Sequence, residues 1–157
     1  MNIDIIAVGK IKEAYFTAAI DEYKKRLGRF TKIQIIQIPD ERIPDNASEK
    51  IKEQIKEREG EKILSAINGG IVAAMCIEGK ETSSEALASF LETSALRDSR
   101  IVFIIGGSLG LSNAVKRRAD TRISFGPITL PHQLMRVVLL EQIYRGFKIN
   151  RNENYHK

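Results

Sequence analysis

Short apolar runs rich in β-branched residues recur along the chain, and charged, helix-like segments separate them. The clearest runs are residues 71–77 and 101–105, in which every residue is apolar. Such runs are typical of strands that are buried on both faces of a parallel sheet. Residues 2–8 and 32–38 extend the same pattern. The alternation predicts an α/β fold in which a mostly parallel sheet carries helices on both faces.

Apolar spacing and capping signals place the helices between these runs. Helices are predicted over residues 13–27, 47–67, 84–96, 113–119 and 131–149, with a further short strand over residues 121–125. Gly60 is a point where the second helix could break. A capping box at residues 82–85 would start the third, with the Thr82 hydroxyl accepting from the Glu85 amide. Pro131 suits the first turn of the last helix because its φ is already helical.

Length and composition narrow the class of protein. A chain of 157 residues suits one domain spanning residues 1–157. Neither long apolar run approaches the ~20 residues of a membrane span, so no membrane partner is expected. The first residues show no basic region followed by an apolar core, so we expect no secretory signal. Cys76 is the only cysteine, which excludes an internal disulfide and a multi-cysteine zinc site and favours a reducing, cytoplasmic location.

The positive charge of the chain is concentrated in its last third. Residues 113–157 hold nine basic and three acidic residues, whereas residues 1–112 carry a net charge of −1. This asymmetry favours a polyanionic partner, RNA or DNA, over a neutral metabolite. A solvated basic face without a partner is the alternative interpretation.

Two loops contain residues that suit ligand binding. Gly106, Gly107 and Gly110 directly follow a buried strand, where glycine lets backbone N–H groups approach a ligand closely. The motif is neither the dinucleotide fingerprint nor the phosphate-binding loop, and a purely structural turn is the alternative. Residues 125–132 combine two prolines and a glycine with apolar side chains. This loop could form a pocket for a small planar ligand, or it could pack into its own core.

The C-terminal region suggests contact with other molecules. Apolar residues occupy nearly every face of the predicted helix 131–149, which predicts a two-fold dimer through this helix, with complete burial inside the monomer as the alternative. Glu141 and Arg145 are spaced to form an ion pair on it. Tyr155 and His156 offer a stacking ring and a group that titrates near neutrality, although a terminal segment of this kind is often frayed. His132 is the second of the two histidines, and their spacing gives no metal site.

Several motifs occur together and in order along the chain. They are Val8-Gly9-Lys10, Pro39-Asp40-Glu41, Glu78-Gly79-Lys80 with Thr82-Ser83-Ser84-Glu85, Ile105-Gly106-Gly107-Ser108 with Gly110, Thr129-Leu130-Pro131-His132-Gln133-Leu134-Met135-Arg136, Leu140-Glu141-Gln142-Ile143-Tyr144-Arg145, and Tyr155-His156. In this combination the chain resembles the bacterial large-subunit ribosomal RNA methyltransferase H family, within the SPOUT class. The resemblance runs from residue 3 to the end, and the segment from Thr129 to Arg145 is its most specific part.

The resemblance implies a SPOUT-type α/β fold whose C-terminal part forms a trefoil knot. General rules of chain topology disfavour knots, so the periodicity does not predict one. The resemblance also implies a homodimer that uses S-adenosyl-L-methionine as methyl donor. Its implied substrate is N3 of a pseudouridine in 23S ribosomal RNA, methylated in the assembled ribosome.

The resemblance also assigns site residues by position. The implied cofactor contacts are Met75, Gly106, Phe125, Gly126, Pro127, Ile128, Thr129 and Leu130. Met75 stands where the family often has leucine. Asn152 stands where the family often has glycine, and asparagine is among the residues that best tolerate a positive φ.

For the reaction, the catalytic candidates are His132, Arg136, Tyr155 and His156. We expect His156 or His132 to assist deprotonation of N3 while Tyr155 packs on the base. Arg136, Arg145 and Lys148 would hold phosphates. For His132, capping of the last helix is the alternative role.

Two other classes of protein remain open from the residues alone. A non-catalytic RNA-binding or ribosome-assembly protein of the same fold would not bind the methyl donor. A small-molecule enzyme that uses the glycine loop would not show strongly salt-dependent binding to ribosomes.

Overall fold

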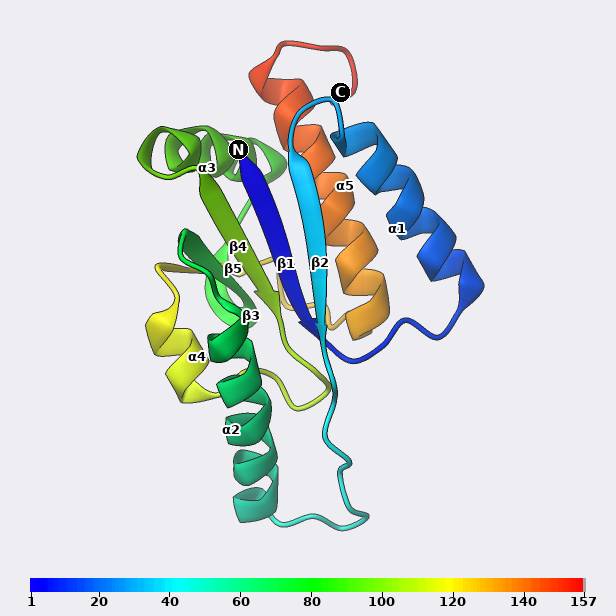
Figure 1. Cartoon of the computed structure of the whole chain (residues 1–157), viewed down its shortest axis with the longest axis vertical. Coiled ribbons are helices and arrows are strands. Elements are labelled where there is room, and N and C mark those ends of the chain that lie inside the picture. Colours follow the sequence, from blue (N-terminus) through cyan, green and yellow to red (C-terminus); the bar gives the residue numbers. More distant parts are fainter. Residues whose placement is uncertain (157) are drawn as a thin grey trace.

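The computed structural model describes residues 1–156 and contains one five-stranded parallel sheet (Figure 1). Its strands are β1 (Asn2–Val8), β2 (Lys32–Ile38), β3 (Ile71–Glu81), β4 (Arg100–Ile105) and β5 (Thr121–Ser124). They lie in the order β2-β1-β4-β3-β5, and all neighbouring pairs are parallel. The predicted α/β architecture with a parallel sheet is therefore confirmed.

Five helices cover the two faces of the sheet. They are α1 (Ala14–Leu27), α2 (Glu49–Ala66), α3 (Ser84–Arg97), α4 (Asn113–Arg118) and α5 (His132–Asn150). Helices α1, α3 and α5 pack on one face, while α2 and α4 pack on the other. No helix within residues 1–156 is long and apolar enough to cross a membrane.

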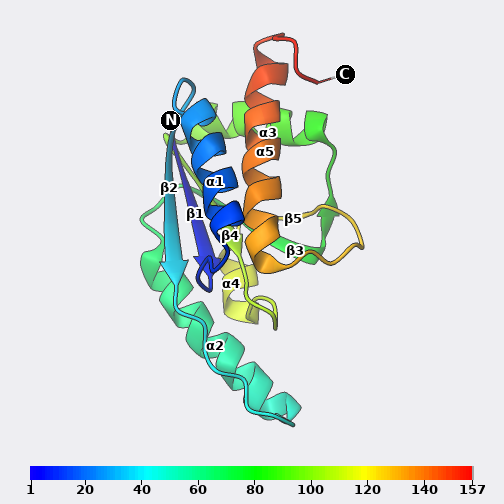
Figure 2. The same ribbon diagram turned by 90° about the vertical axis from the view of Figure 1, so that its right-hand side faces the viewer.

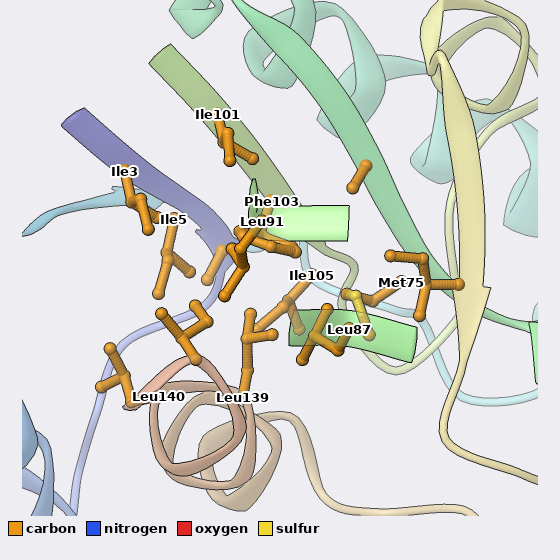
Figure 3. Packing of buried hydrophobic residues seen from close by; sticks show 14 of the residues in the cluster. Ile3, Ile5, Met75, Leu87, Leu91, Ile101, Phe103, Ile105, Leu139 and Leu140 are labelled. Carbon is orange, nitrogen blue, oxygen red and sulfur yellow. The ribbon is translucent and has the colours of Figure 1, made fainter. Parts of the chain in front are cut away.

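Alternate residues of the central strands supply two separate cores. On the α5 side, Ile101, Phe103 and Ile105 of β4 pack with Leu139 and Leu140 of α5 (Figure 3). On the other side, Val102 and Ile104 of the same strand join a cluster with residues of α2 and α4. Successive residues of β4 therefore face opposite layers, which explains why the whole run is apolar.

Three local predictions need correction. The N-cap of α3 is Ser83 rather than Thr82, because the Ser83 hydroxyl accepts from the Ala86 N–H at 3.0 Å. Helix α2 does not break at Gly60, which instead lets this helix approach Ser112 closely: a Cβ atom at Gly60 would lie 2.4 Å from the Ser112 hydroxyl. Pro131 is the N-cap residue of α5 and lies just outside the first turn.

Candidate cofactor pocket and its surroundings

The carboxyl ends of β4 and β5, together with residues 75–78 of β3, open into one cavity of about 630 Å³. In parallel α/β sheets this edge is where ligands bind. Of the cofactor residues suggested by the sequence, the cavity is lined by Met75, Gly106, Phe125, Gly126, Ile128, Thr129 and Leu130. Pro127 belongs to the same loop but does not line the cavity. The two loops singled out from the sequence are thus brought together.

The first wall of the cavity is the glycine turn after β4. The Gly110 N–H donates to the Gly107 carbonyl at 3.1 Å and closes the turn. Gly106 has no room for a side chain, because a Cβ atom there would lie 2.9 Å from Leu111 Cδ2. Gly110 has a φ of +84° and open space beside its Cα. The turn therefore needs glycine for its shape and exposes backbone to the cavity.

The second wall is the loop after β5. The Gly126 N–H donates to the Ser124 hydroxyl at 3.1 Å, and the φ of Gly126 is +101°. No atom lies within 4 Å of the position that a Gly126 side chain would occupy. Ile128 is 75% exposed, so the loop is not packed into its own core. An exposed apolar side chain beside a cavity is suited to contact a ligand.

A small polar group on the α4 side completes the lining. Lys116 pairs with Glu78, and this ion pair lowers the pKa of the Glu78 carboxyl. The Cys76 thiol lies beside them, and burial raises its pKa, which keeps it in the unreactive thiol form. Sequence reasoning missed these lining residues, although Lys116 belongs to the basic last third of the chain.

Helix α5 begins at the downstream end of the second wall, where His132 also lines the cavity. Its ring packs on Gly9 at the end of β1, and a Cβ atom at Gly9 would lie 2.9 Å from His132 Cε1. Burial and the nearby Arg136 guanidinium lower the pKa of His132, so the ring is neutral at pH 7. The His132 side chain does not cap α5, and the alternative role expected for it is therefore wrong.

The expected phosphate contact of Arg136 is also wrong. This side chain is 0% exposed, and its Nη2 donates to the carbonyls of Val8 and Gly9 at 3.0 and 2.6 Å. A buried guanidinium cannot reach an RNA backbone in this conformation. Arg136 instead ties α5 to the end of β1. Its acceptors are the carbonyls of Val8 and of Gly9, and Gly9 is the residue on which the His132 ring packs.

The sequence as a whole matches one family model. The model described as "Predicted SPOUT methyltransferase" matches residues 1–156. The chain belongs to the SPOUT methyltransferase family.

The chain is also similar to full-length relatives and, in fold, to solved structures. Proteins named Ribosomal RNA large subunit methyltransferase H from Clostridium perfringens and Ligilactobacillus salivarius are 54% and 57% identical, over all of both chains. The fold is similar to that of a methylase family protein from Haemophilus influenzae (TM-score 0.57, 12% identity, 99% of this chain and 70% of that chain). It is also similar to a methylase family protein from Neisseria gonorrhoeae (TM-score 0.55, 14% identity, 99% and 86%).

The tail of this SPOUT chain lies away from the cavity. The His156 ring contacts Glu85 of α3 at 2.8 Å and Arg145 of α5 at 3.3 Å. Arg145 follows the cavity-lining Met135 by ten residues, which corresponds to about 15 Å along the helix. Figure 2 shows the tail at the opposite end of α5 from the loop that enters this helix. The expected catalytic residues therefore fall into two groups within one chain.

The tail is nevertheless ordered by specific contacts. The Arg145 guanidinium lies 4.6 Å from the centre of the Tyr155 ring, and Glu141 accepts from both the Arg145 guanidinium and the Tyr155 hydroxyl. Burial and the Glu141 charge raise the pKa of Tyr155 to about 12. Asn152 has a φ of +53°, which confirms that this position needs a residue tolerant of positive φ. The expected ion pair of Glu141 and Arg145 is also confirmed.

Proposed function

We propose that the chain is an S-adenosyl-L-methionine-dependent methyltransferase that methylates N3 of a pseudouridine in 23S ribosomal RNA, in the assembled ribosome. The observation that carries this proposal is the meeting of the two glycine turns in one cavity at the sheet edge. The names of the full-length relatives support the choice of ribosomal RNA as the substrate.

The residues of the cavity fit an adenosyl group. The N–H groups of Gly110 and Gly126 are bonded within their turns, so the open backbone there offers carbonyl acceptors to adenine and ribose. Met75, Leu130 and Ile128 offer apolar walls. A cavity of about 630 Å³ is of the size that small-molecule sites have. When bound, S-adenosyl-L-methionine supplies an electrophilic methyl group on sulfur. The loops need only hold it in line with the attacking nitrogen.

N3 of the base must lose its proton as the methyl group arrives. His132 is neutral at pH 7 and lines the cavity, so it meets the requirements of a general base. His156 is the second candidate. Its ring nitrogens contact Arg145 and Glu85, so it accepts the proton only when one of these contacts opens. The Tyr155 hydroxyl stays protonated near neutrality. Its ring contacts Arg145 and Tyr144 within one chain, and we assign it to packing against the base in place of one of these contacts.

The distance between the tail and the cavity favours a homodimer. Helix α5 keeps Leu134 and Val138 only half-buried and outside the core cluster, which leaves an apolar strip for a second copy. A partner chain docked on α5 with two-fold symmetry would bring its own Tyr155 and His156 toward this cavity. Each site would then combine the cavity of one chain with the tail of the other.

Phosphate contacts shift to other basic residues than those first expected. Arg145 and Lys148 are engaged by Glu141 and Glu153, and they become available to RNA only if these pairs open. Arg117 and Arg122 are exposed and have no ion-pair partner within residues 1–156. We assign these two arginines, on the α4 side of the cavity, to the RNA backbone.

Methyl transfer to intact ribosomes tests the proposal. Purified ribosomes that lack the modification are incubated with labelled S-adenosyl-L-methionine and wild-type, His156→Ala or Tyr155→Phe protein. We expect wild type to label 23S ribosomal RNA and His156→Ala to be impaired. Tyr155→Phe keeps the ring and loses only the hydroxyl bond to Glu141, so it should be impaired less. Wild-type activity in both variants would remove the tail from the mechanism, and absence of labelling by wild type would contradict the proposed function.

Mixed dimers test whether the site is shared. A His156→Ala chain and a chain whose cavity is filled by a large side chain are each first shown to have lost activity alone, and they are then co-purified through two different tags. If each site uses one cavity and the other chain's tail, the mixed dimer contains one intact site and regains about half of wild-type activity per dimer. A mixed dimer as inactive as its parents would show that each chain uses its own tail.

A further inference from the structure

A second, smaller cavity of about 190 Å³ adjoins the cofactor pocket and has an acidic lining. It lies beyond the carboxyl ends of β1 and β2, under the segment that follows Ile38. Asp40, Glu41 and Glu59 line it. Residues 107–109 of the glycine turn and His132 line both cavities, so only this turn and one ring separate the two spaces.

Glu59 is the unusual member of this lining. It is only 5% exposed, although it lies on a helix whose other charged residues are exposed or half-buried. Its Oε2 accepts from the Glu41 N–H at 3.0 Å, whereas no donor within residues 1–156 reaches Oε1. No cation of the described chain forms an ion pair with it. Burial, together with the neighbouring Asp40 and Glu41 charges, raises the pKa of Glu59.

The surrounding acidic groups do not explain this buried carboxylate. Glu41 is balanced by Lys62 at 3.0 Å and by Arg58 at 3.9 Å, but these cations do not pair with Glu59. The described residues include no group of three or more side chains placed to hold a metal ion. One oxygen of this carboxylate is satisfied by the Glu41 N–H, but no cation of residues 1–156 balances its charge. A buried charge without a counter-ion is costly to keep, so a ligand that brings its own cation would explain its presence.

We propose that the acidic cavity binds the α-ammonium group at the methionine end of S-adenosyl-L-methionine, with Glu59 Oε1 as the main acceptor. This inference rests on the proposed function of the larger cavity. The volume is too small for a nucleoside but suits the end of an amino acid. Arg42, which is exposed and also lines this space, is placed to face the carboxylate of the same group.

Gly107 makes the connection between the two cavities possible. A Cβ atom there would lie 3.6 Å from Glu59 Oε1 and 3.1 Å from Val8 Cγ1. A side chain at residue 107 would therefore crowd Glu59 Oε1, the proposed acceptor. Without one, a short aliphatic chain can pass over the turn from the adenosyl pocket to Glu59.

Two ligands that differ only at the amino-acid end provide the test. S-adenosylhomocysteine carries the ammonium and carboxylate groups, and 5′-methylthioadenosine lacks them. Calorimetry measures the affinity of both for wild type, Glu59→Gln and the control Glu57→Gln, which changes an exposed carboxylate on the same helix. Glutamine retains an oxygen for the Glu41 N–H, and thermal melts verify that each variant is folded.

We expect Glu59→Gln to lower the affinity for S-adenosylhomocysteine by about tenfold or more, because a charge-assisted hydrogen bond is lost. Affinity for 5′-methylthioadenosine should not change, and Glu57→Gln should change neither. An equal loss of affinity for both ligands would assign Glu59 a purely structural role and overturn the inference. Unchanged affinity for S-adenosylhomocysteine would also overturn it while leaving the proposed function intact. If neither ligand bound wild type, the proposed function and this inference would fall together.

Discussion

Gly79→Ala tests how closely β5 and the loop after it depend on β3. Gly79 lies where the register between β3 and β5 shifts, between the pairings of Met75 and Lys80. An alanine Cβ would lie 2.8 Å from both the Arg122 carbonyl carbon and the Ile123 nitrogen, and 2.9 Å from the Ile123 carbonyl carbon. All three are backbone atoms, so no side-chain rotation relieves the overlap and β5 must move.

The cost follows from these contacts. Overpacking of this kind costs about 1–3 kcal/mol, and backbone contacts belong in the upper part of that range. Replacing glycine with alanine also lowers the conformational entropy of the unfolded chain, which offsets about 0.4–1 kcal/mol of this loss of stability. We therefore expect a net loss of about 2 kcal/mol, or a fall in Tm of about 4–8 °C for a chain of this size. Because β5 leads directly into residues 125–130, affinity for S-adenosyl-L-methionine should fall as well.

Urea unfolding and calorimetry measure the two effects of Gly79→Ala, and Gly69→Ala is the matched control. Gly69 has a φ of +76° but no atom within 4 Å of a built Cβ, so alanine there costs only backbone strain of about 1–2 kcal/mol. The control should lose stability without losing affinity for S-adenosyl-L-methionine. A Gly79→Ala protein as stable as wild type, or one that binds the ligand equally well, would refute the reasoning.

Three further predictions concern charge and pH. In ribosome binding, Arg122→Gln should lower the slope of log affinity against log salt by about one. Arg136→Met should leave the slope unchanged, because Arg136 is buried. Equal slopes in both variants would contradict the assignment of Arg122 to the RNA backbone. Because the pKa of His132 is lowered in the folded chain, the unfolded chain binds more protons as pH falls below about 6.5. Urea midpoints should therefore drop on acidification, less so in His132→Gln, and parallel curves would refute the role of this ring. Because the pKa of Glu59 is raised in the folded chain, wild type loses stability as pH rises from about 4.5 through the pKa of the folded chain. Glu59→Gln should therefore be more stable than wild type at pH 7 and no more stable at pH 4. A variant less stable than wild type at pH 7 would contradict this.

Most of the fold could be predicted, because strands buried in a parallel sheet are continuous apolar runs that can be recognised in the sequence. The bounds of β1 and β2 agree with the apolar runs 2–8 and 32–38. β3 differs, since it continues past residue 77 to Glu81. Its last residues are charged, and they are strand only because Lys80 and Glu81 pair with β5 after the register shift. That pairing is a tertiary event without a local signal.

The site was predictable where backbone geometry defines it and unpredictable where a charge is buried. Glycines at residues 106–110 and 126 mark the turns, so the two walls of the cavity could be named from the sequence. Arg136 looked like a surface cation, because periodicity cannot show that the carbonyls of Val8 and Gly9 lie beside it. Glu59 belongs to a strongly charged helix, and its only sequence signal of burial is its spacing of four residues from both Ile55 and Ile63.

A crystal structure of the protein with bound S-adenosyl-L-methionine tests the central claim most directly. Calorimetry first establishes the concentration at which binding is saturated, and crystals are then grown or soaked above it. We expect the adenosyl group to lie between Gly106 and Leu130, with the turn after β4 on one side and the loop after β5 on the other. Density for the ligand anywhere else on the chain, or none in this cavity under saturating conditions, would contradict the assignment.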